Sequence, residues 1–214
     1  MRRLTACVLM MTLLLSGCKA GSGGEAPEEA ALALRERYQA LAGWSAAVDI
    51  SVCYTETVYD FTLEAQWRRK GETVLTVAAP EEVAGITARI AGGETVLEYD
   101  GAGLSLGLLD ESGLTPVSAV TACMEQIETG WMARCAWAGE NGEFLQISFR
   151  DPEGEAGAGT QFLLTFDWAS QALLSAEVSV EGVTVLTAGF RNFTTEMMTS
   201  NDTGDDAGDR ADLG

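Results

Sequence analysis

The segment that decides the fold runs from Ala46 to Arg68 and reads AAVDISVCYTETVYDFTLEAQWR. In its first half every second residue is apolar, and these residues are Val48, Ile50, Val52 and Tyr54. The alternation resumes after the short connection at residues 55–57, with Tyr59, Phe61, Leu63, Ala65 and Trp67. Because neighbouring side chains of a strand point to opposite faces of a sheet, this pattern predicts two long antiparallel strands with one buried face.

Two helices are expected outside this hairpin. The first is predicted over residues 27–42, where Glu28 and Glu29 lie in the first turn and Gly43 ends the helix. Its apolar residues recur at helical spacing, and they are Ala31, Leu34, Tyr38 and Leu41. The second begins at Thr115-Pro116, and its apolar face consists of Val117, Val120, Met124, Ile127 and Trp131. Each helix is amphipathic and therefore has one face to bury.

The rest of the chain predicts a mainly β (α+β) protein. Further strands are expected at 72–78, 85–90, 95–100, 104–109, 132–138, 144–150, 161–168, 173–180 and 183–193. Gly-rich, Pro-containing or acidic turns separate them, and their spacing is typical of a meander that closes into a barrel or a sandwich. The total is about ten or eleven strands and two helices.

Composition excludes several classes of function. The chain has 214 residues, a formal charge of −19 and no histidine. The negative charge repels phosphate backbones, so nucleic acid is not an expected partner. The absent histidine removes Ser-His-Asp and Cys-His schemes, and no P-loop, GxSxG, SxxK or GxGxxG motif occurs. We predict that the protein is not an enzyme and has no cofactor and no metal site.

The N-terminus predicts a lipid anchor. Residues 1–17 form a signal peptide with Arg2 and Arg3, an apolar run and small residues, and Leu15-Ser16-Gly17-Cys18 matches a bacterial lipobox. Lipidation of Cys18, for example by palmitate, would hold the protein at the extracytoplasmic side of the cell membrane, or at an outer membrane if the organism has one. The alternative is an ordinary signal peptide followed by a chance cysteine. Residues 18–29 are then a flexible tether, 30–195 the domain and 196–214 an acidic disordered tail.

Three cysteines remain in the mature domain: Cys53, Cys123 and Cys135. An exported compartment permits a disulfide, and a helix followed by a strand could bring Cys123 and Cys135 together. Free or buried thiols are the alternative.

Several local signatures, in this order, resemble the LolA/LolB-like family of lipoprotein-sorting carriers. They are YQALAGWSA at 38–46, PEEVAGI at 80–86, LEYDGAGL at 97–104, FDW at 166–168, LSAEV at 174–178, EG at 181–182 and FRNF at 190–193. The resemblance covers about residues 30–193. It implies a curved, half-open antiparallel β-barrel with the N-terminal and central helices as a lid over a concave apolar surface.

The resemblance also implies the site. The candidates for a concave face that receives acyl chains or a lipoprotein are Tyr59, Phe61, Leu63, Trp67, Phe162, Leu164, Phe166 and Trp168; the alternative for each is an ordinary core residue. Arg69 is the nearest match to the family's lid latch, although the family's proline is absent. Arg68 and Arg69 could instead contact a partner, or form a solvated hairpin tip.

Two functions remain open on this basis. One is a membrane-anchored lipoprotein that binds a hydrophobic ligand, in lipoprotein sorting or envelope maintenance. The other is a docking or sensing lipoprotein that supports a cell-envelope or spore-germination enzyme, similar to the germination lipoproteins of spore-forming bacteria.

Overall fold

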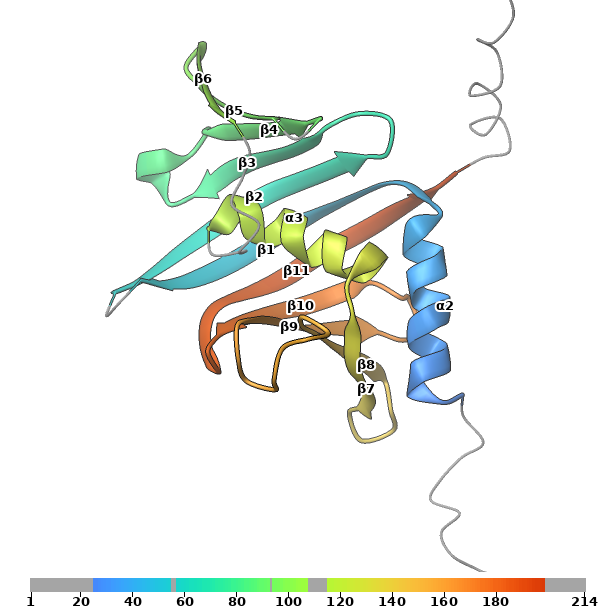
Figure 1. Cartoon of the computed structure of the whole chain (residues 1–214). Coiled ribbons are helices and arrows are strands. Elements are labelled where there is room, and N and C mark those ends of the chain that lie inside the picture. The colour runs from blue at the N-terminus through green and yellow to red at the C-terminus, as the bar shows by residue number, and fades with distance from the viewer. Residues whose placement is uncertain (1–24, 55–56, 93, 108–114, 199–214) are drawn as a thin grey trace, which may run out of the picture.

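A single antiparallel sheet of eleven strands forms the body of the described structure. The computed structural model describes residues 25–54, 57–92, 94–107 and 115–198. The strands are β1 (Leu41–Tyr54), β2 (Thr57–Arg68), β3 (Thr73–Ala79), β4 (Thr87–Ala91), β5 (Glu94–Tyr99), β6 (Ala102–Gly107), β7 (Met132–Ala138), β8 (Phe144–Phe149), β9 (Thr160–Asp167), β10 (Leu173–Val180) and β11 (Val183–Met197). Their order is β6-β5-β4-β3-β2-β1-β11-β10-β9-β8-β7, and the two edge strands of this described sheet, β6 and β7, do not pair. The sheet is therefore a curved half-barrel that stays open, as expected from the sequence (Figure 1).

The hairpin formed by residues 41–68 lies at the centre of the sheet. Strands β1 and β2 pair along their whole length, from Gly43 opposite Arg68 to Tyr54 opposite Thr57. A side chain at Gly43 would place its Cβ 2.8 Å from the carbonyl oxygen of Trp67, so only glycine permits this close approach. The first and last strands also pair with each other, with Val48 opposite Phe190. The two halves of the sheet thus join at the β1–β11 pair.

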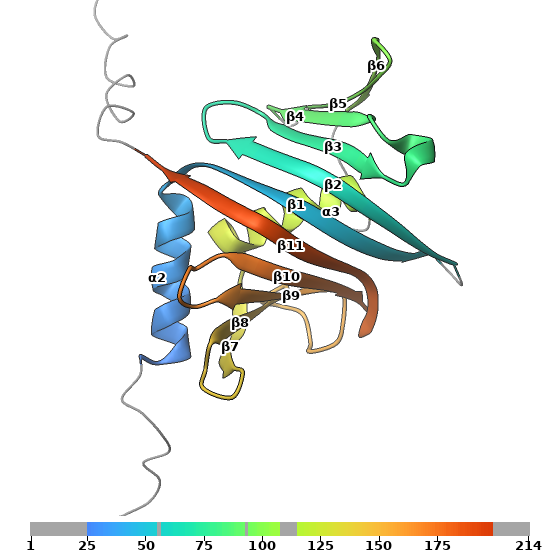
Figure 2. The same cartoon turned by 180° about the vertical axis from the view of Figure 1, so that it is seen from behind.

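Both helices lie on the concave face of the sheet. Helix α2 (Pro27–Gln39) covers the end of the sheet near β7 and β8, and α3 (Pro116–Thr129) crosses the middle of the concave face (Figure 1). Within the described ranges the opposite face carries no helix, as the view from behind shows (Figure 2). Helix α3 begins with a capping box in which the Thr115 and Ser118 side chains each bond the other residue's backbone amide.

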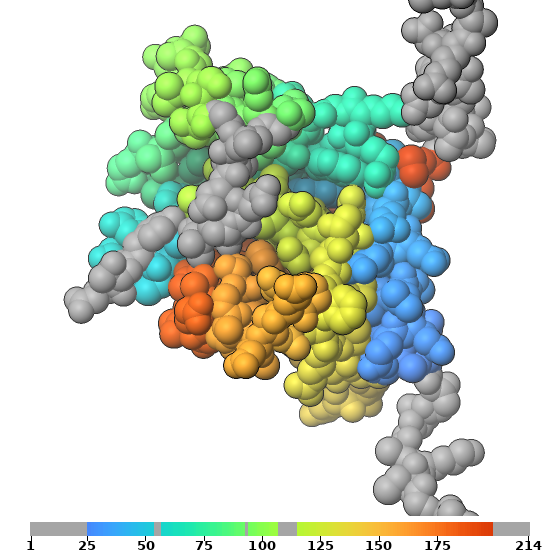
Figure 3. All heavy atoms as spheres, in the orientation of Figure 1, coloured from blue at the N-terminus to red at the C-terminus, as the bar shows by residue number. Residues whose placement is uncertain are grey.

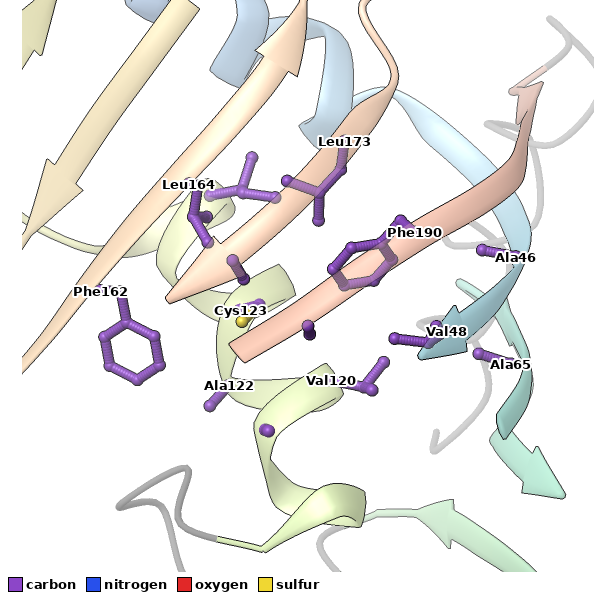
Figure 4. Close-up of a cluster of buried hydrophobic side chains, with 14 of the residues drawn as sticks. Ala46, Val48, Ala65, Val120, Ala122, Cys123, Phe162, Leu164, Leu173 and Phe190 are labelled. Atoms are coloured by element: carbon purple, nitrogen blue, oxygen red, sulfur yellow. The ribbon is translucent and has the colours of Figure 1, made fainter. Parts of the chain in front are cut away.

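The core fills the space between α3 and the sheet. Helix α3 buries Val120, Cys123 and Ile127 against the strands, and Figure 4 shows this helix beside Leu164 and Phe190. On the strands, alternate residues such as Val48 and Ile50 point into the same core. The period-two pattern of the sequence therefore marks the concave face, because that is the face on which the helices pack.

Several predicted boundaries differ from the structure. Helix α2 ends at Gln39, not residue 42, because β1 already begins at Leu41 and pairs with β11. The predicted tether extends to residue 29, but Pro27 to Glu29 form the first turn of α2. The predicted tail begins at residue 196, but Glu196 lies in β11 opposite Gly43. The signal peptide, Cys18 and residues 199–214 lie outside the described residues.

None of the helices in the described ranges is long and apolar enough to cross a membrane.

Candidate ligand-binding groove

A groove of about 330 Å³ opens between α3, the C-terminal end of α2 and strands β1 to β3. Its lining residues are Tyr38, Leu41, Trp44, Trp67, Thr73, Thr121, Met124, Glu125, Glu128 and Thr129. Figure 3 shows the corresponding recess between α3, in yellow-green, and the teal strands. We name this cavity the α3 groove.

Two regular features of the fold create the α3 groove. On the sheet side, Trp44, Trp67 and Thr73 stand next to one another across β1, β2 and β3, because Trp44 pairs with Trp67 and Trp67 with Thr73. On the helix side, Thr121, Met124, Glu125 and Glu128 follow at spacings of three, one and three residues, which places them in one stripe along α3. The α3 groove is the space between these three sheet residues and this stripe of helix residues.

An aromatic cluster fixes the inner wall of the α3 groove. The Trp44 ring stacks on Phe193, with centroids 5.9 Å apart and planes 11° from parallel. Tyr38 contacts Phe166 edge to face at 5.7 Å, and its hydroxyl donates a hydrogen bond to the carbonyl oxygen of Gln171 at 3.0 Å. Burial raises the pKa of Tyr38 well above its ordinary value, so the hydroxyl stays protonated as a donor. Each ring of this wall is thus held by neighbours from other elements.

Arg69, at the start of the β2–β3 turn, connects the sheet to both helices. Its Nε donates to the carbonyl oxygen of Leu41 at 2.7 Å, and its Nη2 donates to that of Gln39 at 2.6 Å. The same Nη2 lies 3.7 Å from Glu128 Oε1 on α3. The guanidinium also lies over the Trp67 ring, 5.2 Å from its centroid. The residue predicted from the family as a lid latch thus contacts α2, α3 and the groove wall.

The two helices are also joined directly. Arg35 of α2 donates from Nε to the carbonyl oxygen of Ile127 at 2.9 Å and from Nη2 to that of Gly130 at 2.5 Å. Gln39 donates to the carbonyl oxygen of Glu128 at 2.7 Å. These side chains satisfy carbonyl groups at the C-terminal end of α3 that have no partner within the helix.

The outer rim of the α3 groove is acidic. Glu125 is exposed, whereas Glu128 is partly buried between α3 and Arg69. Burial raises the pKa of the Glu128 carboxyl above its ordinary value, and the Arg69 guanidinium opposes part of this shift. Among the described residues that line the groove there is no lysine or arginine.

The predicted concave-face residues share a face but not a cavity. Their pairings place seven of the eight on the concave side, for example Phe61 opposite Ile50 and Phe162 opposite Val178, and Trp168, which follows β9, packs against the same core. Leu63, Phe162, Leu164 and Phe166 are buried core residues. Phe61 and Trp168 pack partly buried against the core, and Tyr59 is 49% exposed beyond the end of α3. Among the eight, Trp67 alone lines the α3 groove.

The two arginines at the hairpin tip that were predicted as a possible partner contact, Arg68 and Arg69, bind other residues of this chain. Arg68 forms a bidentate ion pair with Glu196 of β11, with Nη1–Oε2 at 2.6 Å and Nη2–Oε1 at 3.3 Å. Arg69 is held by the carbonyl groups described above. Together with Lys70, Ala42 and Met198 these arginines line a second, smaller hollow of about 200 Å³.

The possible disulfide between Cys123 and Cys135 is not formed. Both residues are free thiols, and Cys123 is fully buried on the face of α3 that packs against the sheet. The helix and the strand do follow each other as expected, but Cys123 faces the sheet core while Cys135 lies on the edge strand β7 near α2. The structure thus fits the alternative of free or buried thiols.

Nine of the ten groove residues are missing from the site candidates that the sequence supplied, and three of them matter most for the chemistry of the groove: Trp44, Glu125 and Glu128. Trp44 is four residues before Val48 and therefore lies on the same face of the strand. A predicted strand that began at or before residue 44 would have placed Trp44 on the concave face. Glu125 and Glu128 lie beside the predicted apolar face of α3, and only packing reveals that their edge of the helix overhangs a cavity. Within the described ranges no three Cys, Asp or Glu residues are grouped closely enough to hold a metal ion.

No protein-family description matches the chain, and no curated protein matches it. Solved structures with a similar arrangement include a putative outer-membrane lipoprotein-sorting domain from Vibrio parahaemolyticus, with TM-score 0.47 and 11% identity over 81% of this chain and 94% of that one. A chain from the complex of the CwlD amidase with the GerS lipoprotein of Clostridioides difficile gives TM-score 0.46 and 13% identity over 81% and 98%. An uncharacterized conserved protein from Thermus thermophilus gives 0.47 and 10% over 80% and 89%. The matches also include a LolA superfamily protein from Nitrosomonas europaea.

Proposed function

We propose that this protein is an envelope lipoprotein, anchored through Cys18, that binds the hydrocarbon chain of an amphiphile in the α3 groove, in lipoprotein sorting or envelope maintenance. The observation that carries the proposal is the groove itself, in which Leu41, Trp44, Trp67 and Met124 present apolar surface around about 330 Å³. Such a volume lies at the lower end of the range for small-molecule sites. The groove therefore suits one chain and not several.

The energetics favour a hydrocarbon ligand. Each buried methylene group contributes about 0.8 kcal/mol, so six to eight methylene groups supply roughly 5 to 6 kcal/mol before the entropic cost of association. The stacked wall of Trp44 and Phe193 is already formed, so little of this gain is lost in ordering the site. With no cost of association, 5 to 6 kcal/mol corresponds to a Kd of about 40 to 200 μM, so the expected affinity is about 0.1 mM or weaker, which suits reversible loading.

The chain that would carry the proposed anchor enters α2 at the end opposite the α3 groove. The tether joins this helix at Pro27, and the groove is lined by Tyr38 near its C-terminus. At 1.5 Å per residue the two points are about 17 Å apart along the helix. A lipid-anchored chain can thus hold the groove mouth away from the bilayer surface.

The test is direct binding by the protein that begins at Lys19. Dodecyl maltoside, used below its micellar concentration, should give a one-to-one adduct by native mass spectrometry and by titration calorimetry. Thr121→Trp, which places an indole into the groove from α3, should remove the adduct. Trp131→Ala changes an exposed tryptophan outside the groove lining and should leave binding unchanged. An absent adduct, or an adduct that survives Thr121→Trp, would contradict the proposal.

The alternative of a docking lipoprotein rests on the predicted anchor, the tether and the positive charge at the hairpin tip, and only the last of these lies within the described residues. Arg68 is paired with Glu196, and Arg69 is held by carbonyl groups and Glu128. We therefore place ligand binding ahead of docking through this tip.

A further inference from the structure

The α3 groove combines apolar aromatic walls with an acidic rim. The indole rings of Trp44 and Trp67 and the phenol of Tyr38 line it, and Glu125 and Glu128 stand at its edge on α3. Aromatic faces attract cations through the negative potential above the ring, and carboxylates attract them by charge. Both features disfavour an anionic group in the same place. The chemistry of the walls therefore constrains the polar end of any ligand.

The two acidic residues occupy an unfavourable position for a helix. They lie in the last two turns of α3, where the carbonyl ends of the peptide dipoles concentrate negative potential, and the last turn carries no basic residue. A helix stabilised for its own sake would carry Lys or Arg there. Glu128 recovers part of this cost through its ion pair with Arg69, so the unexplained choice is Glu125, and local choices that cost stability without a structural return are found preferentially at functional sites.

The Arg69 side chain shows how a cationic group is held beside the α3 groove. The Arg69 guanidinium lies 5.2 Å from the centroid of Trp67 and 3.7 Å from the Glu128 carboxylate. Arg69 approaches from the hairpin side and does not line the α3 groove, so Glu125 and the groove-facing side of the aromatic wall remain for a ligand. A second cation that enters along the groove would meet the same pair of chemical groups.

We propose that the α3 groove selects amphiphiles whose polar head is cationic, a quaternary ammonium or a primary amine, with the hydrocarbon chain against Leu41 and Met124 and the head between the aromatic wall and Glu125. This inference rests on the proposed function, since it assigns the class of head group to the same site.

The experiment compares single-chain amphiphiles with the same twelve-carbon tail. Dodecyltrimethylammonium, dodecylamine, dodecyl maltoside and dodecyl sulfate are titrated into the protein that begins at Lys19, below their micellar concentrations and at about 150 mM salt, where long-range attraction is screened. One exposed carboxylate, a second that is partly buried beside Arg69, and one cation–π contact predict about tenfold tighter binding of the two cationic probes than of the maltoside. The sulfate should bind more weakly than the maltoside.

Variants separate the groove from the general acidity of the chain. Glu125→Gln should weaken trimethylammonium binding about threefold and leave maltoside binding unchanged. Glu82→Gln removes one charge from the exposed 3₁₀ turn between β3 and β4 and should change neither. Glu128→Gln is a second test, although it also releases Arg69. Circular dichroism confirms that each variant remains folded with the probe present.

Each outcome has one meaning. Equal affinities for the ammonium and maltoside probes would overturn the head-group inference and leave the proposed function standing. Equal weakening by Glu82→Gln and Glu125→Gln would also overturn it, because the effect would then belong to surface charge in general. If maltoside fails to bind, or Thr121→Trp leaves cation binding intact, the proposed function and the inference fail together.

Discussion

Arg69→Met tests whether a single side chain fastens the two helices to the sheet. The substitution retains an aliphatic stem of similar length beside Trp67 but removes the guanidinium. It abolishes the hydrogen bonds to the carbonyl oxygens of Leu41 at 2.7 Å and Gln39 at 2.6 Å. It also abolishes the ion pair with Glu128 and the contact of the cation with the Trp67 ring.

The magnitude can be worked from these contacts. Each charge-assisted hydrogen bond is worth about 1 kcal/mol after discounting for a side chain that is about a third exposed. The ion pair adds about 0.5 kcal/mol and the cation–π contact about 0.5 kcal/mol. The sum is about 3 kcal/mol, which for a domain of this size lowers the melting temperature by about 9 °C.

The assay is thermal and urea unfolding followed by circular dichroism, with hydrogen exchange read at the last turn of α2. Arg69→Lys keeps the charge but not the planar fork, so it should recover less than half of the loss. Arg68→Met removes an exposed pair with Glu196 and should shift the midpoint little. Equal shifts for the Arg68 and Arg69 variants, or full recovery by lysine, would refute the latch.

Three further results are expected. Phe166→Ala should destabilise by about 3 to 5 kcal/mol because its ring is fully buried, whereas Tyr59→Ala, at a 49% exposed position, should have a small effect; equal losses would mean that the core is wrongly placed. Burial raises the pKa of Cys123 to about 12, so this thiol should resist aromatic disulfide reagents at about pH 8 until the chain unfolds, while exposed Cys53 reacts in the native protein. Because the unfolded thiol ionises first, stability from Cys123 should be complete below about pH 9 and decline toward about pH 12; a flat profile in the Cys123→Ala difference would contradict this. Cys18→Ser should abolish metabolic labelling with palmitate and release the protein from membranes, and continued labelling would refute the lipobox.

The sequence predicted the elements because their signals are local. Alternation at Val48, Ile50 and Val52 marks the concave face, and the capping pair Thr115 and Ser118 lies within one helical turn. Asp100-Gly101 and Glu181-Gly182 form the two-residue turns between β5 and β6 and between β10 and β11, and all four residues have positive φ. Each of these features depends on neighbours a few residues away.

The site was less accessible from the sequence, because packing decides which concave residues become core. Phe162 and Leu164 have the same pattern as Trp67, yet α3 covers the first two and leaves a groove beside the third. The place at which α3 crosses the sheet sets this difference. The alternation of apolar residues along the strands does not encode where the helix lies. The family resemblance pointed to Arg69, but it did not predict which groups the Arg69 side chain contacts.

By itself, the sequence predicted about ten or eleven strands, two helices, the buried face of each and a lipid anchor, since all of these predictions follow from the chemistry of adjacent residues. Only the tertiary structure decided that β1 pairs with β11 and that Trp44, Trp67, Glu125 and Glu128 surround one cavity. The physical reason is that these contacts join residues far apart in the chain. Their geometry depends on how whole elements pack, and each local pattern is compatible with more than one such packing.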